Sequence, residues 1–409
     1  MKIDWKVLGK VWFFGLVSAV MMLAGSYLAL LKQGEGLGDE RTEEVVEIYY
    51  MKLDGIYRVD SKNDVEERVV EGEFIFTSLY GKRKFDFMGD RQQYLVYVEQ
   101  EEYEGVEEWR WGQSLHVYDV DKKEEVWAEE TGVDESVLEF MVSPDDQRMV
   151  FIRNSRKSDL EYDREVLIWD VDSQVVEKWI NEPSRTDGPS LALSLGSWLN
   201  NDEMTIGKMY EGGSYCKLSI SQDTKVPDNC SGMGGFHMGY SDIVYFGLDE
   251  YAYGSNFVDL NFRGGGVQKD RQGLYKIGIE SGIREYFLDD VGRDLVTDSQ
   301  KIYFFNINQE GSYNTEVNSD LYVTDVNGQV VERLSNNGNQ LATKNGLYLS
   351  NNGRYLSYFE TDITEQDLNL VEVKFRQSSV WVYDIQLSEL YKVIDGALQP
   401  IVVTRELGI

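Results

Sequence analysis

A two-strand pattern that recurs along the chain constrains its fold more than any other feature of the sequence. Each copy has a strand with alternating apolar residues, a short polar turn and a second strand of the same kind, as in Leu115–Trp127 (LHVYDVDKKEEVW). Seven copies begin at positions 55, 115, 166, 216, 273, 320 and 380, which gives a period of about 54 residues. The sequence therefore predicts one repeated antiparallel unit.

A repeat of this length that consists of strands alone is typical of a β-propeller. The repeats contain no stretch with the i, i+3, i+4 apolar spacing of an amphipathic helix. Each copy would be the outer hairpin of one blade. We therefore predict an all-β, seven-bladed β-propeller over residues 45–404, with six or eight blades as alternatives and a short tail at 405–409.

The first blade lacks a strand in the sequence. Only Val45–Tyr50 precedes its outer hairpin, which is too little for two inner strands, whereas Pro400–Thr404 is a spare strand. We expect this C-terminal strand to supply the missing inner strand of the first blade. It would then close the ring and leave no open sheet edge.

Inner hairpins are also readable, because turns rich in Asp and Asn separate apolar strands in Met88–Val98, Val142–Ile152 and Ser350–Phe359. The segment Ser143-Pro144-Asp145-Asp146, with Val150-Phe151-Ile152 and then Ile168-Trp169-Asp170, resembles the TolB-like, or WD40-like, propeller repeats. The resemblance covers roughly residues 45–404 and implies the fold. It says little about activity, because the fold hosts unrelated functions.

The first 44 residues predict where the chain is located. Val11–Leu31 contains 21 residues without a charged side chain, which as a helix can cross about 30 Å of hydrocarbon. Three lysines precede it, and an acidic, glycine-rich linker at 32–44 follows it. The positive-inside rule then predicts a cytoplasmic N-terminus at 1–10, an uncleaved transmembrane signal anchor, and an extracytoplasmic propeller in the periplasm or at the cell surface. A cleaved signal peptide is the alternative.

The acidity of the chain limits its partners. It has 40 Lys and Arg residues against 72 Asp and Glu residues, a net charge of −32. Nucleic-acid affinity comes largely from basic side chains that displace counterions, so we exclude DNA and RNA as partners.

The connection between the second and third strands of a blade is the extended one in most repeats, and long loops on one face of a rigid scaffold usually carry function. In the loop within 99–113 the candidate binding residues are Tyr103, Trp109, Arg110 and Trp111, since aromatic residues with Arg anchor interfaces and stack on sugar rings. The simpler alternative is that the two tryptophans pack onto the rim of their own blade.

Cys216 and Cys230 are centred on position 223, inside a polar turn, so in a regular hairpin they would face each other. Export to an oxidising compartment favours a disulfide between them. The alternative is two unpaired thiols without a redox role.

No motif in the chain indicates a cofactor or a catalytic residue. Two histidines and two cysteines are too few for most zinc frameworks, and the glycine-rich segments match neither a dinucleotide-binding nor a phosphate-binding loop. We expect no metal. Calcium stays open as an alternative without a motif, because paired aspartates such as Asp119 and Asp121 do not form a calcium-loop pattern.

The function that these patterns favour is a membrane-anchored, non-enzymatic module that binds or scaffolds a protein partner in the cell envelope. The alternative is a carbohydrate-binding or polysaccharide-degrading propeller that uses carboxylates on the long-loop face. Dipeptidyl-peptidase-like proteins resemble this chain in their anchor and propeller, but their catalytic domain would follow the propeller, and the sequence stops at Ile409. Enzymatic activity is left undecided and is not favoured.

Overall fold

Short antiparallel strands make up the described part of this computed structural model. The structure describes residues 44–60, 65–72, 74, 84–101, 112–157, 162–182, 192–209, 214–224, 226, 240–245, 251–256, 273–278, 284–289, 291–298, 300–307, 318–328, 331–335, 343–361 and 378–406. These residues contain strands and no helix. The described part of the chain has no helix that is long and apolar enough to cross a membrane, and the anchor predicted at 11–31 lies outside it.

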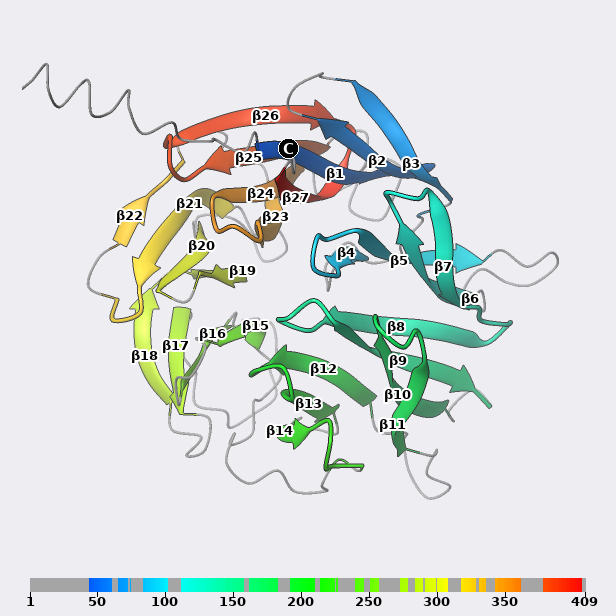
Figure 1. Ribbon diagram of the computed structural model, residues 1–409. Helices are drawn as coiled ribbons and strands as arrows, with labels where there is room; N and C mark the ends of the chain where they lie inside the picture. The colour runs from blue at the N-terminus through cyan, green and yellow to red at the C-terminus, as the bar shows by residue number, and fades with distance from the viewer. Residues whose placement is uncertain are drawn as a thin grey trace, which may run out of the picture. The chain divides into compact units, whose positions relative to one another are not determined.

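Strands from the two ends of the propeller share one sheet. Its order is β27-β1-β2-β3, with β27 (Leu398–Glu406), β1 (Glu44–Lys52), β2 (Gly55–Asp60) and β3 (Glu66–Glu71). In sequence, β27 contains the spare strand at 400–404 and β1 contains the lone strand at 45–50. The C-terminal strand is therefore hydrogen-bonded beside the first strand of the propeller (Figure 1).

The second sheet has eight strands, and β6 and β8 are joined through one parallel residue pair, Gln113 with Ser136. On one side of that pair the strands follow the order β4-β5-β6-β7, and on the other side the order β8-β9-β10-β11. The strands are β4 (Phe85–Met88), β5 (Tyr94–Glu101), β6 (Gly112–Asp119), β7 (Glu124–Glu129), β8 (Glu135–Val142), β9 (Arg148–Arg156), β10 (Tyr162–Asp170) and β11 (Val176–Glu182).

The remaining described strands form four sheets, each with its strands in chain order. One contains β12 (Ala192–Trp198), β13 (Glu203–Met209) and β14 (Ser214–Ser219); the next contains β15 (Tyr240–Tyr245), β16 (Tyr251–Asn256), β17 (Gly273–Gly278) and β18 (Arg284–Asp289). The last two contain β19 (Val291–Thr297), β20 (Lys301–Ile307), β21 (Asn318–Asp325) and β22 (Val331–Arg333), and β23 (Thr343–Leu349), β24 (Tyr355–Thr361), β25 (Ser378–Asp384) and β26 (Glu389–Asp395).

The sheets surround a common centre, which makes Val45–Arg405 an all-β propeller (Figure 1). The other unit of the chain, 1–44 with 406–409, lies almost wholly outside the described residues. Six predicted outer hairpins are present as β2–β3, β6–β7, β10–β11, β17–β18, β21–β22 and β25–β26. For the hairpin that begins at 216, the structure describes only its first strand, β14.

The core lies between neighbouring sheets. One cluster of buried side chains includes Tyr49 of β1, Phe87 of β4 and Val403 of β27. The rings of Tyr49 and Phe87 lie edge to face, with their centroids 4.6 Å apart. Each such buried side chain contributes about 1.5–3 kcal/mol through removal of apolar surface from water. This packing holds the chain's last strand against the second sheet as well as the first.

Candidate binding site on the short-turn face

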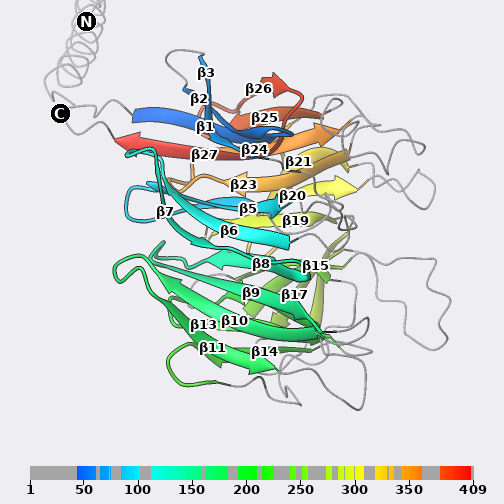
Figure 2. The same ribbon diagram turned by 90° about the vertical axis from the view of Figure 1, so that its right-hand side faces the viewer.

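The described short turns between β4 and β5, β6 and β7, β8 and β9, β10 and β11, β12 and β13, β23 and β24, and β25 and β26 lie on one side of the propeller (Figure 2). We call this side the short-turn face; its fully described turns include 89–93, 120–123, 143–147, 171–175, 199–202, 350–354 and 385–388. Neighbouring turns bond to one another. Gln147 Nε2 donates to Asp90 Oδ1 at 2.7 Å, and Arg148 Nη2 donates to the carbonyl of Asn201 at 2.5 Å. These contacts fix the turns relative to their neighbours.

A hollow of 740 Å³ opens on this face between the β19–β20 turn and the β23–β24 turn. Its volume lies within the usual range of ligand pockets, about 300–1,000 Å³. Apolar residues form part of its lining, namely Leu295, Val296, Tyr348 and Leu349. Polar residues form the rest, namely Thr297, Asp298, Gln300, Ser350, Asn351 and Asn352, together with Gly353.

Asp298 is fixed in the lining by three hydrogen bonds. Its Oδ1 accepts from the backbone N–H groups of Gln300 at 3.0 Å and Lys301 at 2.8 Å. Its Oδ2 accepts from the hydroxyl of Tyr303 at 2.8 Å. Burial and this hydrogen bond raise the pKa of Tyr303, so the tyrosine stays protonated and remains the donor. The carboxylate is thus held in one orientation at the start of the turn.

The opposite wall is the β23–β24 turn, which is fixed by hydrogen bonds among its own residues. Ser350 Oγ donates to Asn352 Oδ1 at 2.7 Å and accepts from the backbone N–H of Tyr355 at 2.9 Å. Gly353 follows with a φ of 69°, a left-handed conformation that glycine adopts without steric cost. Within this turn, Asn351 Oδ1 accepts from Thr404 Oγ1 of β27 at 2.8 Å. Both walls of the hollow are therefore formed before any ligand arrives.

The β8–β9 turn repeats this pattern with an aspartate in place of the glycine. Asp146 has a φ of 57°, and its carbonyl accepts from the backbone N–H of Gly89 at 2.6 Å. Burial, followed by the charges of Asp86, Asp145 and Asp90, raises the pKa of Asp146 to about 7.

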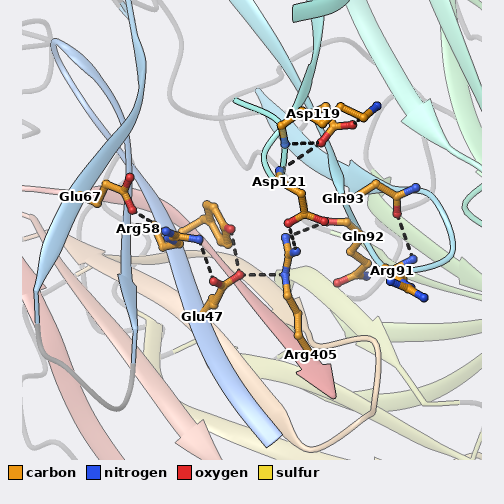
Figure 3. A network of polar contacts seen from close by, with 11 residues as sticks. Glu47, Arg58, Glu67, Arg91, Gln92, Gln93, Asp119, Asp121 and Arg405 are labelled. Atoms are coloured by element: carbon orange, nitrogen blue, oxygen red, sulfur yellow. Dashed lines mark hydrogen bonds and ion pairs between the residues drawn. The ribbon is translucent and has the colours of Figure 1, made fainter. Parts of the chain in front are cut away.

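A second polar network on this face joins the ends of the propeller (Figure 3). Arg405 of β27 forms ion pairs with Glu47 of β1 at 2.9 Å and with Asp121, in the β6–β7 turn, at 2.6 Å. Glu47 also accepts from Arg58 Nη1 at 2.8 Å. Arg405 Nη2 donates to the carbonyl of Gln92 at 3.3 Å. The network is a structural connection, since each charged group in it is occupied by another.

His116 in β6 contacts neighbouring side chains of the blade. His116 Nδ1 lies 2.7 Å from Glu125 Oε2, and its ring stacks on Tyr97 with centroids 5.0 Å apart. The residues that the structure describes contain no group of three or more His, Cys, Asp or Glu side chains that could hold a metal ion.

The binding residues proposed from the sequence, Tyr103, Trp109, Arg110 and Trp111, lie between β5 and β6 and outside the described residues. Cys216 lies in β14 with 4% of its surface exposed. Cys230, the other cysteine of the chain, lies outside the described residues, and its pairing with Cys216 stays a prediction.

Comparisons with known proteins show the fold of the chain but no family to which it belongs. No model of a protein family matches the chain, and no curated protein matches its sequence. Among solved structures, the β-propeller domain of the Trilobed protease from Pyrococcus furiosus is similar over 76% of this chain and 85% of that one, at 12% identity and a TM-score of 0.47.

A puromycin-hydrolysing peptidase from Mycobacterium tuberculosis is similar over 87% of this chain, at 10% identity and a TM-score of 0.54. An acylaminoacyl peptidase from Pyrococcus horikoshii is similar over 86% of this chain, at 12% identity and a TM-score of 0.49. The chain covers 52% and 51% of these two peptidases, about half their length. At such identities the likeness concerns the fold alone.

Proposed function

We propose that this chain is a membrane-anchored, extracytoplasmic β-propeller that holds a protein partner in the cell envelope, as a binding or scaffolding module rather than an enzyme. The observation that carries the proposal is the hollow on the short-turn face. Its walls are two turns fixed by their own hydrogen bonds, so little conformational entropy is lost when a ligand binds.

The lining of the hollow suits a polypeptide. Amide side chains of Gln300 and Asn351 offer both donors and acceptors, which match the N–H and C=O groups of a peptide backbone. Apolar side chains such as Leu295 and Leu349 lie in the same hollow and can pack against an apolar side chain of the partner. This combination supports protein binding.

Three further features belong to the proposal. The eight-stranded sheet would be two blades that touch through the Gln113–Ser136 pair, so that the six sheets make seven blades. The turn at 143–146 supports a TolB-like repeat. Residues 11–31 would be the signal anchor. An experimental structure in which β4–β11 form one continuous blade would contradict the blade count.

A scaffold needs more than one contact surface, and the loop with Tyr103, Trp109, Arg110 and Trp111 is the second surface that we propose. Substitution of both tryptophans with alanine should then weaken retention of a partner without a change in folding. Unchanged retention would favour the packing of these rings onto their own blade.

Crosslinking of the full chain in native membranes, followed by co-purification, tests the proposal. We expect a protein partner to be recovered repeatedly with the wild type and to be lost with Gln300→Trp, which fills the hollow from an exposed position. Asp172→Trp places the same ring on an exposed turn of the same face, beside β10 and β11, and should leave recovery unchanged. Failure to recover any partner, together with retention of glycans on an array, would favour the carbohydrate-binding alternative.

A further inference from the structure

The hollow carries charge of one sign. Among its described lining residues Asp298 is the only acidic one, and the others have amide, hydroxyl or apolar side chains or are glycine. The described lining contains no Lys or Arg. An anionic ligand would therefore meet a carboxylate and no compensating base.

The Asp298 carboxylate is positioned to bind a cation. Three donors fix its plane, and Oδ2, which accepts one hydrogen bond from Tyr303, can accept a second. A charge-assisted hydrogen bond to such a preorganised carboxylate is roughly twice as strong as one between neutral groups. The Tyr303 side chain behind it is 1% exposed, which keeps water from that side of the carboxylate.

The rest of the hollow suits a long aliphatic chain with a charged end. Leu295, Val296 and Leu349 share the cavity with Asp298, and Lys and Arg bury their methylene stems along such apolar surface. The net charge of −32 on the whole chain also attracts a basic partner and speeds its encounter.

We propose that the hollow binds a Lys or Arg side chain of a basic segment in the protein partner, with Asp298 as the residue that recognises its charge. This inference rests on the proposed function. It defines the partner by chemistry: a polypeptide with an exposed basic segment, whose backbone contacts Gln300 and Asn351.

Fluorescence anisotropy of the full chain with labelled lysine-rich, glutamine-rich and glutamate-rich peptides of equal length tests the inference. We expect the lysine-rich peptide to bind and the glutamate-rich peptide not to bind. Asp298→Asn, which keeps an acceptor for the two backbone N–H groups, should weaken binding by at least fivefold. Asp172→Asn removes the same charge elsewhere on the short-turn face and should weaken it less than twofold.

Charge changes at Gln300 provide a second test, because its side chain is exposed and only its backbone N–H bonds to Asp298. Gln300→Glu should strengthen binding of the lysine-rich peptide, and Gln300→Lys should weaken it. Equal effects of Asp298→Asn and Asp172→Asn would overturn the inference, because binding would then follow net charge alone.

The two proposals fail in different ways. If crosslinking recovers a partner that Gln300→Trp releases but Asp298→Asn and Gln300→Lys retain, the binding module stands and the basic-segment inference is wrong. If no partner is recovered from native membranes, the protein-binding function itself is wrong.

Discussion

The Nε atom of Arg405 lies 2.9 Å from Oε2 of Glu47, and this ion pair joins the last strand of the propeller to the first (Figure 3). The side chains are only 18% and 10% exposed. Glu47 Oε2 also accepts from the hydroxyl of Tyr49 at 2.9 Å, and burial raises the pKa of that tyrosine so that it stays a donor. The two ends of the ring are therefore connected by charge as well as by strand pairing.

Arg405→Ala should lower the free energy of unfolding by about 3 kcal/mol, because it leaves the largely buried Glu47 with less compensation. Arg405→Lys keeps the charge but loses the guanidinium's several contacts, so we expect an intermediate loss. Urea-induced unfolding of the full chain measures both. Arg68→Ala is the matched control, because its pair with Glu71 is exposed and should contribute less than about 1 kcal/mol.

A double-mutant cycle with Glu47→Gln separates the pair from its surroundings. The coupling energy between Glu47→Gln and Arg405→Ala should exceed about 1 kcal/mol, as for residues in one ion-pair network. Additive effects of the two substitutions would show that Arg405 stabilises the ring through Asp121 and Gln92 instead.

Asp146 should make stability fall as pH rises. Its pKa is raised to about 7 in the folded chain, whereas an unfolded aspartate titrates near about 4. Between those values the folded state keeps a proton that the unfolded state has released, so the unfolding free energy decreases with pH and levels off above about 7.

Asp146→Asn removes a charge that burial and neighbouring carboxylates disfavour, so it should stabilise the chain at pH 8 by roughly 2 kcal/mol. This value is smaller than the full pKa shift would give, because solvent screens part of the repulsion from Asp86, Asp145 and Asp90. Asparagine also tolerates the positive φ at this position. At pH 4 the variant and the wild type should be equally stable. A constant difference between Asp146→Asn and the wild type at both pH values would contradict the assignment.

Much of the fold could be predicted because strand period and turn chemistry are local properties of the sequence. The Asp-rich and Asn-rich segments after Ser143 and Ser350 are tight turns with left-handed residues at Asp146 and Gly353, which their residue types indicate. A count of strands per repeat likewise predicts that the C-terminal strand pairs with the first blade, and in the structure β27 lies beside β1.

The hollow could not be predicted, because it forms where turns of two sheets meet. Asp298 lies about 50 residues before Ser350 in sequence. No pattern in either turn shows that residues of the two turns line one cavity. The polar segment Thr297–Gln300 is typical of a turn, but such a segment predicts only a connection between two strands and no binding site. The raised pKa of Asp146 also depends on residues about 60 positions earlier in the chain, through Asp86 of β4 and Asp90 of the β4–β5 turn.

Cys216 and Cys230 should form a disulfide that closes a loop of about 15 residues and contributes about 3 kcal/mol to stability. Cys216 is buried, so thiol labelling must be done in denaturant. No label should be incorporated before reduction and two per chain after it. Labelling to the same extent in both states would rule the disulfide out, and Cys216→Ser should then leave the unfolding free energy nearly unchanged.

The segment 11–31 should keep the full chain in the membrane fraction after alkaline carbonate extraction. Two arginines at its centre, Leu16→Arg with Met21→Arg, should release the chain, because each charge costs about 2.5–3.5 kcal/mol at the middle of a transmembrane helix. Leu16→Ala with Met21→Leu keeps the segment apolar and should remain in the membrane. The intact mass then separates the two interpretations of the N-terminus: a chain that retains its first 31 residues is anchored, whereas a mature N-terminus near Gly25 or Ser26 identifies a cleaved signal peptide.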